Sequence, residues 1–209
     1  DLDGVAAAQL YAKAGVVAAR LHDHCGSWER PEGFTRHSWD AEGLVGETPL
    51  WGRFWEYDRL TDAQRDLLLE ARRRARTELD RIGRHPHNYG LIHADLVPEN
   101  LLDEGGQLKL IDFDDAGHGW FLFELATALY FNLEAPGYRD VRRGLLAGYR
   151  SVRPLSAEEE ALLPLFIFLR GTTYLGWVQS RPETETARSM GPMLIELACA
   201  AAREYLAAL

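Results

Sequence analysis

One stretch of the sequence restricts the possible fold more than any other. It covers residues 91–115 and reads LIHADLVPENLLDEGGQLKLIDFDD. Short apolar runs at 91–92, 101–102 and 108–111 indicate strands, and the polar, glycine-containing segment 103–107 is typical of a hairpin tip. A hairpin here would hold the residues before its first strand and after its second strand at the same end.

Four polar side chains surround this predicted hairpin at fixed spacing. They form the pattern His93-x-Asp95-x-x-x-x-Asn100, followed twelve residues later by Asp112. Phosphoryl transfer needs such a convergence, because the protein works mainly by positioning and charge compensation. We expect Asp95 to accept the proton of the attacking hydroxyl or to orient it. Asn100 and Asp112 would hold Mg2+ against the phosphates, since that ion prefers hard oxygen ligands. Each residue alone would be interpreted as a turn residue, but the four together favour catalysis.

The pattern resembles the catalytic loop of kinase-like enzymes, H-x-D-x-x-x-x-N followed by a metal-binding Asp. More narrowly, HADLVPENLL and LIDFDD look like the motifs of the aminoglycoside phosphotransferase and choline kinase superfamily. The resemblance runs from about residue 5 to about residue 149, and more loosely to the C-terminus. It implies an ATP- and Mg2+-dependent phosphotransferase with an alcohol group as acceptor. In such an enzyme His93 would brace the loop, Asp95 would be the base, and Asn100 and Asp112 would be the Mg2+ ligands.

The resemblance also implies a fold class. We expect a mainly α chain with a small β-hairpin, corresponding to the C-terminal, helical lobe of the protein-kinase-like fold. Enzymes of this kind carry a smaller N-terminal lobe with a glycine-rich loop and a Lys–Glu pair. The sequence shows no such loop after a strand, and Lys13 lies inside the first predicted helix. We therefore expect the ATP-clasping lobe to be absent from this chain. It would be a further part of the same protein that packs on this lobe, and activity would require it.

The 209 residues, 46% of them hydrophobic, are enough for a single domain. We expect a core at 1–130 that holds the catalytic loop, and a helical acceptor-side subdomain at 131–209. The first helix should run over about 3–24, with Asp3 as N-cap and Gly26 just past its end. The other expected helices cover about 61–82, 120–130, 138–150, 157–179 with a kink near Pro164, and 183–208. Segment 27–57 should be irregular.

Two pairs of side chains are candidates for binding the acceptor. Asp114 and Asp115 could bind a second metal or a cationic substrate, or could cap the following helix. Trp51 and Trp55 could form part of a cage for a cationic amine, or could only pin their segment to the domain. The net charge of -9 suits a cationic acceptor and argues against nucleic acid or an anionic membrane as partner.

Three functional alternatives remain at this stage. A small-molecule hydroxyl acceptor is favoured because the segment after Asp112 is too short for the activation segment of regulated protein kinases. An atypical bacterial Ser/Thr protein kinase of the stress-response type, and a noncatalytic binding or regulatory module, are the other two. The sequence leaves open the acceptor, the oligomeric state, any role in antibiotic resistance, and whether the gene encodes the missing lobe.

The sequence also carries a prediction about location. Cys25 and Cys199 lie far apart and lack metal-ligand spacing, which indicates a reducing compartment. No apolar run approaches the roughly 18 residues of a membrane span. We expect a cytoplasmic protein.

Overall fold

The computed structural model describes residues 4–209. These residues form two compact units, each built from two segments of the chain. The first unit contains the residues up to Ser38 together with His85–Ala161, and the second contains Trp39–Arg84 and Leu162–Leu209. Contacts between helices far apart in the sequence define these units, and the expected functional boundary at residue 130 stays a prediction.

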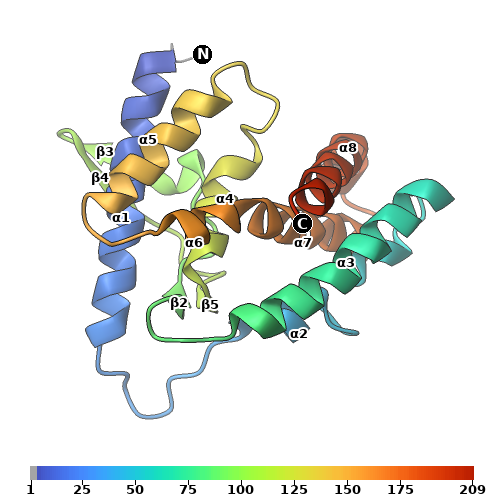
Figure 1. The fold of residues 1–209 in the computed structure, drawn as a ribbon, viewed down its shortest axis with the longest axis horizontal. Helices are drawn as coiled ribbons and strands as arrows, with labels where there is room; N and C mark the ends of the chain where they lie inside the picture. Colours follow the sequence, from blue (N-terminus) through green and yellow to red (C-terminus); the bar gives the residue numbers. More distant parts are fainter. Residues whose placement is uncertain (1–3) are drawn as a thin grey trace. The chain divides into compact units, whose positions relative to one another are not determined.

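Four helices form the frame of the first unit, namely α1 (Gly4–Ser27), α4 (Phe121–Tyr130), α5 (Tyr138–Arg150) and α6 (Ala157–Ala161). Figure 1 shows α1 and α5 side by side. They pack with their backbones in contact, since a Cβ added at Gly144 or Gly148 would collide with the backbone of Ala8 or Ala12. The small residues of both helices therefore make this close packing possible.

The strands of the first unit lie next to the predicted catalytic segment. Strand β2 (Tyr89–Ile92) pairs antiparallel with β5 (Gly117–Trp120), and the two-residue strand β1 (Ser38–Trp39) follows on the other side of β5. Strands β3 (Leu101–Glu104) and β4 (Gln107–Leu110) form the predicted hairpin. Its tip is the pair Gly105–Gly106, with φ of 63° and 87°. Two successive positive φ angles are typical of a two-residue type I′ turn, so the tip is shorter than the expected 103–107.

The second unit contains α2 (Ala41–Val45), the 3-10 turn η1 (Phe54–Glu56), α3 (Asp62–Ile82), α7 (Leu163–Ser180) and α8 (Glu185–Ala207). The start of α3 was predicted correctly: Thr61 and Gln64 form a reciprocal capping box. Gly83, with φ of 64°, ends the helix. Arg72 of α3 donates hydrogen bonds to the carbonyl oxygens of Val45 and Gly46, which fixes the end of α2.

Several predicted boundaries were wrong. Helix α1 continues past Gly26 to Ser27, whose hydroxyl donates to the carbonyl of His24, while the proposed cap Asp3 lies outside the described residues. Segment 27–57 is not wholly irregular, because β1, α2 and η1 lie within it. The helix expected at 157–179 is interrupted at Leu162, and Pro164 lies in the first turn of α7, where its missing N–H leaves no helical bond unmade.

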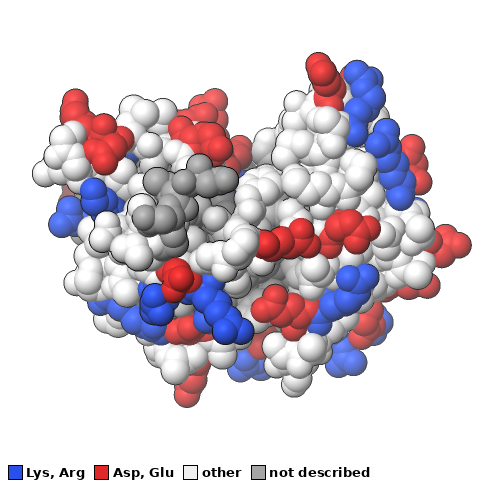
Figure 2. Space-filling model, turned by 90° about the horizontal axis from the view of Figure 1, so that it is seen from above, with Lys and Arg blue, Asp and Glu red and all other residues white. Residues whose placement is uncertain are grey.

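Acidic and basic side chains are interspersed over the face shown in Figure 2. This mixture agrees with the ion pairs along the helices, such as Arg74 with Glu70 and Arg143 with Asp140. Among the helices that the structure describes, none is both long and apolar enough to cross a membrane.

Candidate active site

The loop that follows β2 carries two of the predicted catalytic residues. His93 is fully buried, and its Nδ1 accepts a hydrogen bond from the amide of Asp95 at 3.2 Å. Because Nδ1 is the acceptor, Nε2 is the protonated nitrogen, and it donates to the carbonyl of Ile111 at 2.9 Å. The ring of Phe113 packs edge-on against the imidazole, with 4.7 Å between centroids. His93 therefore connects the loop after β2 to the end of the hairpin through both ring nitrogens. Its role in catalysis stays a prediction.

Asp95 and Asn100 are in direct contact. The amide nitrogen of Asn100 donates to Oδ2 of Asp95 at 2.8 Å and to its carbonyl oxygen at 2.9 Å. These two bonds fix the orientation of the Asn100 amide, which is 8% exposed, and leave its oxygen as the atom suited to a cation. The amide of Ile111 donates to the carbonyl of Asn100 at 3.0 Å and so extends the hairpin ladder toward Asp112.

Asp112 lies one residue beyond this extended ladder, is exposed, and has a φ of 62°. A left-handed conformation costs a residue other than glycine about 1–2 kcal/mol, and Asp and Asn tolerate it better than most. One long hydrogen bond accompanies this conformation, from the amide of Asp114 to Asp112 Oδ1 at 3.5 Å. The structure thus brings all four residues of the predicted pattern to one end of the hairpin.

The predicted metal ligands are one carboxylate and one amide oxygen. Within residues 4–209, no three His, Cys, Asp or Glu side chains form a ready-made metal cluster. Mg2+ does not require one, because it keeps several waters and usually binds through one or two protein oxygens together with substrate phosphates. The donor set of Asn100 and Asp112 fits such an ion.

Asp114 and Asp115 lie in a turn that the Ala116 amide closes by donating to the carbonyl of Phe113. Asp114 is exposed and Asp115 half-buried. The alternative that they cap the following helix is wrong, because β5 intervenes and the N-cap of α4 is Trp120. Their suggested role in binding a metal or substrate stays a prediction.

Trp51 and Trp55 belong to the second unit, and each faces a cation of that unit. The guanidinium of Arg72 lies 4.0 Å from the centroid of the Trp55 ring, and Arg181 lies 5.0 Å from that of Trp51. These contacts agree with the alternative that the rings pin their segment in place. Their suggested role in acceptor binding remains a prediction.

Glu124 was not among the residues predicted for the site, and its contact with the loop after β2 was missed. This residue of α4 is fully buried, and its Oε2 accepts hydrogen bonds from the amides of His93 at 2.7 Å and Ala94 at 2.9 Å. Ala94 has a φ of 65°, so the carboxylate holds the loop at a strained position. The available signal was one acidic residue in an otherwise uncharged, mostly apolar helix, FLFELATALY, since a buried charge requires partners.

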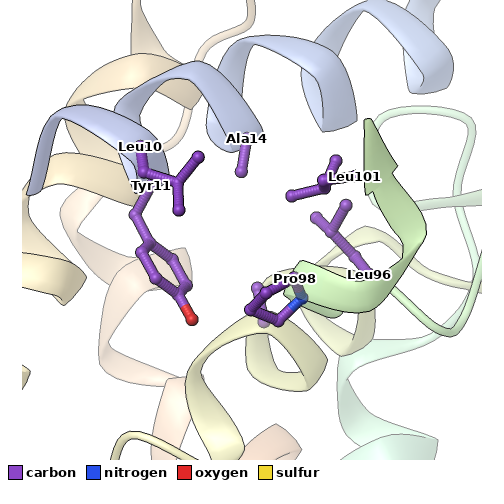
Figure 3. A pocket seen from close by; sticks show the side chains of 7 residues that line it. Leu10, Tyr11, Ala14, Leu96, Pro98 and Leu101 are labelled. Carbon is purple, nitrogen blue, oxygen red and sulfur yellow. The ribbon is translucent and has the colours of Figure 1, made fainter. Parts of the chain in front are cut away.

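A small apolar hollow lies between α1, α4 and the loop after β2 (Figure 3). Leu10, Tyr11 and Ala14 of α1 and Leu96 and Pro98 of the loop line it, together with Leu101 and Ala128. It has room for no more than about one water molecule and lacks the polar partners that a water needs. We interpret it as a packing gap.

Comparison with known proteins decides the family. The phosphotransferase enzyme family, APH, matches residues 2–162 of this sequence. The chain belongs to this family. The resemblance noted from the sequence is thereby confirmed, with its four-residue pattern inside the matched range.

Curated relatives of this family member include a homoserine kinase of Sinorhizobium fredii (strain NBRC 101917 / NGR234). It is 34% identical over 166 residues, which are 76% of this chain and 47% of the relative. A homoserine kinase of Neisseria meningitidis serogroup B (strain ATCC BAA-335 / MC58) is 42% identical over 89 residues, covering 41% of this chain and 29% of its own length. The chain thus spans about half, or less, of the relatives it matches.

A microcompartment-associated aminopropanol kinase is similar in structure, with a TM-score of 0.86 and 37% identity over 94% of this chain and 62% of that one. The prediction of a mainly helical kinase-like lobe with a small hairpin is confirmed by this match.

Proposed function

We propose that this chain is the catalytic part of an ATP- and Mg2+-dependent kinase that phosphorylates a hydroxyl group of a small amine-bearing molecule. The observation that carries the proposal is the hydrogen-bonded group of Asp95, Asn100 and His93, which is joined through Ile111 to Asp112. The relatives support the acceptor class, because homoserine and aminopropanol, after which they are named, are both amino alcohols in the broad sense.

In the proposed reaction the hydroxyl oxygen of the acceptor forms a bond to the γ-phosphorus of ATP. The bond between that phosphorus and the bridging oxygen breaks, ADP leaves, and Asp95 accepts or orients the hydroxyl proton. Asn100 keeps the Asp95 carboxylate in one orientation through its 2.8 Å hydrogen bond. Asn100 and Asp112 would hold Mg2+, which would compensate the phosphate charge when bound.

The outer face of the hairpin is the proposed resting place of the nucleotide. Leu102 pairs with Lys109 and lies on the same face of the hairpin as Ile111, because side chains alternate along a strand. Leu102 is 50% exposed and Ile111 39% exposed. Exposed apolar side chains next to the proposed metal ligands suit the flat, apolar face of a base.

The decisive experiment is transfer of labelled γ-phosphate by the full-length protein to a pool of amino alcohols, hydroxy amino acids, sugars and aminoglycosides. We expect the label in a small molecule. Asp95→Asn should lower kcat by about 10²- to 10⁴-fold, because a general base is removed, while the KM for Mg·ATP changes little. Asp103→Asn, on the exposed hairpin, is the matched control with the same change of charge.

Each other outcome has a defined meaning. Label found only in protein would favour a protein kinase. No label from a protein shown to be folded would favour a noncatalytic module. Near-wild-type turnover by Asp95→Asn would contradict the role given to that residue. The isolated 209 residues are predicted to bind ATP weakly, which calorimetry can test directly.

A further inference from the structure

Arg36 and His37, in the segment that follows α1, contact the loop and the strand next to the candidate active site. The guanidinium Nη1 of Arg36 donates to the carbonyl oxygen of Asp114 at 3.1 Å. The next residue, His37, accepts a hydrogen bond from the amide of His118 in β5 at 2.9 Å. Arg36 thereby contacts Asp114, which lies two positions after the proposed metal ligand Asp112 in the sequence.

His37 packs directly against Gly117 of β5. A Cβ added at this glycine would lie 2.9 Å from Cδ2 of the His37 imidazole and 2.8 Å from the His37 carbonyl oxygen. Separations this short do not occur between real atoms of this kind, so only glycine leaves room for the ring. The approach of the segment 36–38 to β5 is thus built into the sequence of the strand.

We call Arg36, His37, His118 and Arg30 the basic flank. Burial lowers the pKa of His118, and the nearby charges of Arg30 and His37 lower it further. The lowered pKa of His118 favours its neutral form, and Arg36 and Arg30 bring permanent positive charges to the flank.

Among the described residues, the charged guanidinium of Arg36 has no carboxylate partner. The side chain is exposed, and its hydrogen bond goes to a backbone carbonyl of the loop 112–115, although three of the four residues in this loop carry carboxylates. Among the described residues Arg36 makes no ion pair, whereas Arg143 and Arg150, for example, each do. One Nη is used, so the guanidinium keeps further N–H donors in a planar fork that matches a carboxylate.

We propose that the basic flank, with Arg36 as its main contact, binds a carboxylate group of the acceptor, so that the acceptor is a hydroxy amino acid and not a carboxylate-free amino alcohol. This inference rests on the proposed kinase function and deepens it. It distinguishes between the two acceptors that the relatives are named for, because homoserine carries a carboxylate and aminopropanol does not.

The test compares two acceptors that differ only in the carboxylate, L-homoserine and 3-aminopropan-1-ol, with the full-length protein. We expect kcat/KM to be at least about tenfold higher for homoserine. Arg36→Gln should lower kcat/KM for homoserine by about 10- to 100-fold, mainly through KM, because a charged hydrogen bond is lost. The same variant should leave kcat/KM for 3-aminopropan-1-ol within about twofold, since this acceptor makes no use of the arginine. Arg139→Gln, exposed on α5, is the control with the same change of charge.

Several results would overturn the inference. One is a wild-type preference for 3-aminopropan-1-ol, and another is an equal loss with both acceptors in Arg36→Gln. A raised KM for ATP in that variant would show that the flank contacts phosphates instead. Phosphorylation of other compounds but of neither acceptor leaves the kinase function standing and removes the inference.

If no compound is phosphorylated at all, the proposed function fails, and calorimetric titration with homoserine in the presence of Mg2+ and AMP-PNP tests the flank separately. Binding that Arg36→Gln weakens would support the flank as a carboxylate site, and absence of binding would overturn it.

Discussion

The two sides of the candidate active site are built in opposite ways. The loop at residues 93–95 is buried or half-buried and held from within, by Glu124 through two amides and by the imidazole of His93. The loop at 112–115 is mostly exposed, with one 3.5 Å hydrogen bond inside it and a contact with Arg36 from outside. The proposed base thus lies on a fixed support, whereas the proposed metal and acceptor contacts lie where the chain can adjust to a ligand.

The largest effect is expected from Glu124→Ala, which removes the support of the fixed side. Two buried amides would lose their acceptor, at a cost of about 2–4 kcal/mol in the free energy of unfolding. Activity should fall by about 100-fold or more, because Asp95 would lose its position. Thermal unfolding and phosphate transfer measure the two effects.

Glu124→Gln is the informative companion variant, since it keeps an oxygen acceptor and removes only the charge. It should recover part of the lost stability. If both variants unfold and react like the wild type, the loop does not depend on α4 and the contrast between the two sides disappears.

A smaller loss of stability is expected at acid pH, through His22, which packs against the helix α4 that supports the loop at 93–95. His22 stacks on Phe121, the first residue of α4, with 4.3 Å between ring centroids, and Tyr149 lies at 2.9 Å from its Nδ1. Burial, reinforced by the charge of Arg153, lowers the pKa of His22 to about 3. The unfolded chain takes up this proton below pH 6.5 and the folded chain does not, so stability is complete above about pH 7 and falls as the pH drops toward 3.

At pH 5 the loss amounts to about 2 kcal/mol, from about 1.4 kcal/mol per pH unit. Urea unfolding at pH 7.5 and pH 5 measures it, and a His22→Gln variant supplies the baseline without this group. An equal loss in the wild type and in the variant would assign the acid sensitivity to other residues.

The smallest effect is expected at Ala94. Its φ of 65° suits glycine, so Ala94→Gly relieves strain while adding flexibility to the unfolded chain. These contributions oppose each other, and we expect a change within about 1 kcal/mol. Ala94→Val, with a β-branched side chain at the same buried site, should be clearly destabilising. Equal stability of the two variants in thermal unfolding would show that the loop is not strained.

The parts of the site that could be predicted were those encoded in a short segment. The hairpin and the four-residue pattern need only residues 91–115, and strand alternation fixes their geometry. Strand β5 was missed because its sequence, GHGW, contains two glycines and owes its pairing to β2, which lies more than twenty residues earlier.

Glu124 and Arg36 were missed for a related reason. Each acts on a partner that is distant in the sequence, His93 for the first and Asp114 for the second. No local pattern marks these contacts, although a buried charge in α4 was a usable signal. The two compact units likewise depend on contacts between distant segments, such as the packing of α1 against α5.

That helix pair has a wider consequence. Where Gly144 and Gly148 meet Ala8 and Ala12, main-chain atoms set the separation of the helices. At these contacts, side-chain rotamers therefore do not set the distance between the two helices. A larger residue at either glycine would push the helices apart there, whichever rotamer its side chain adopted.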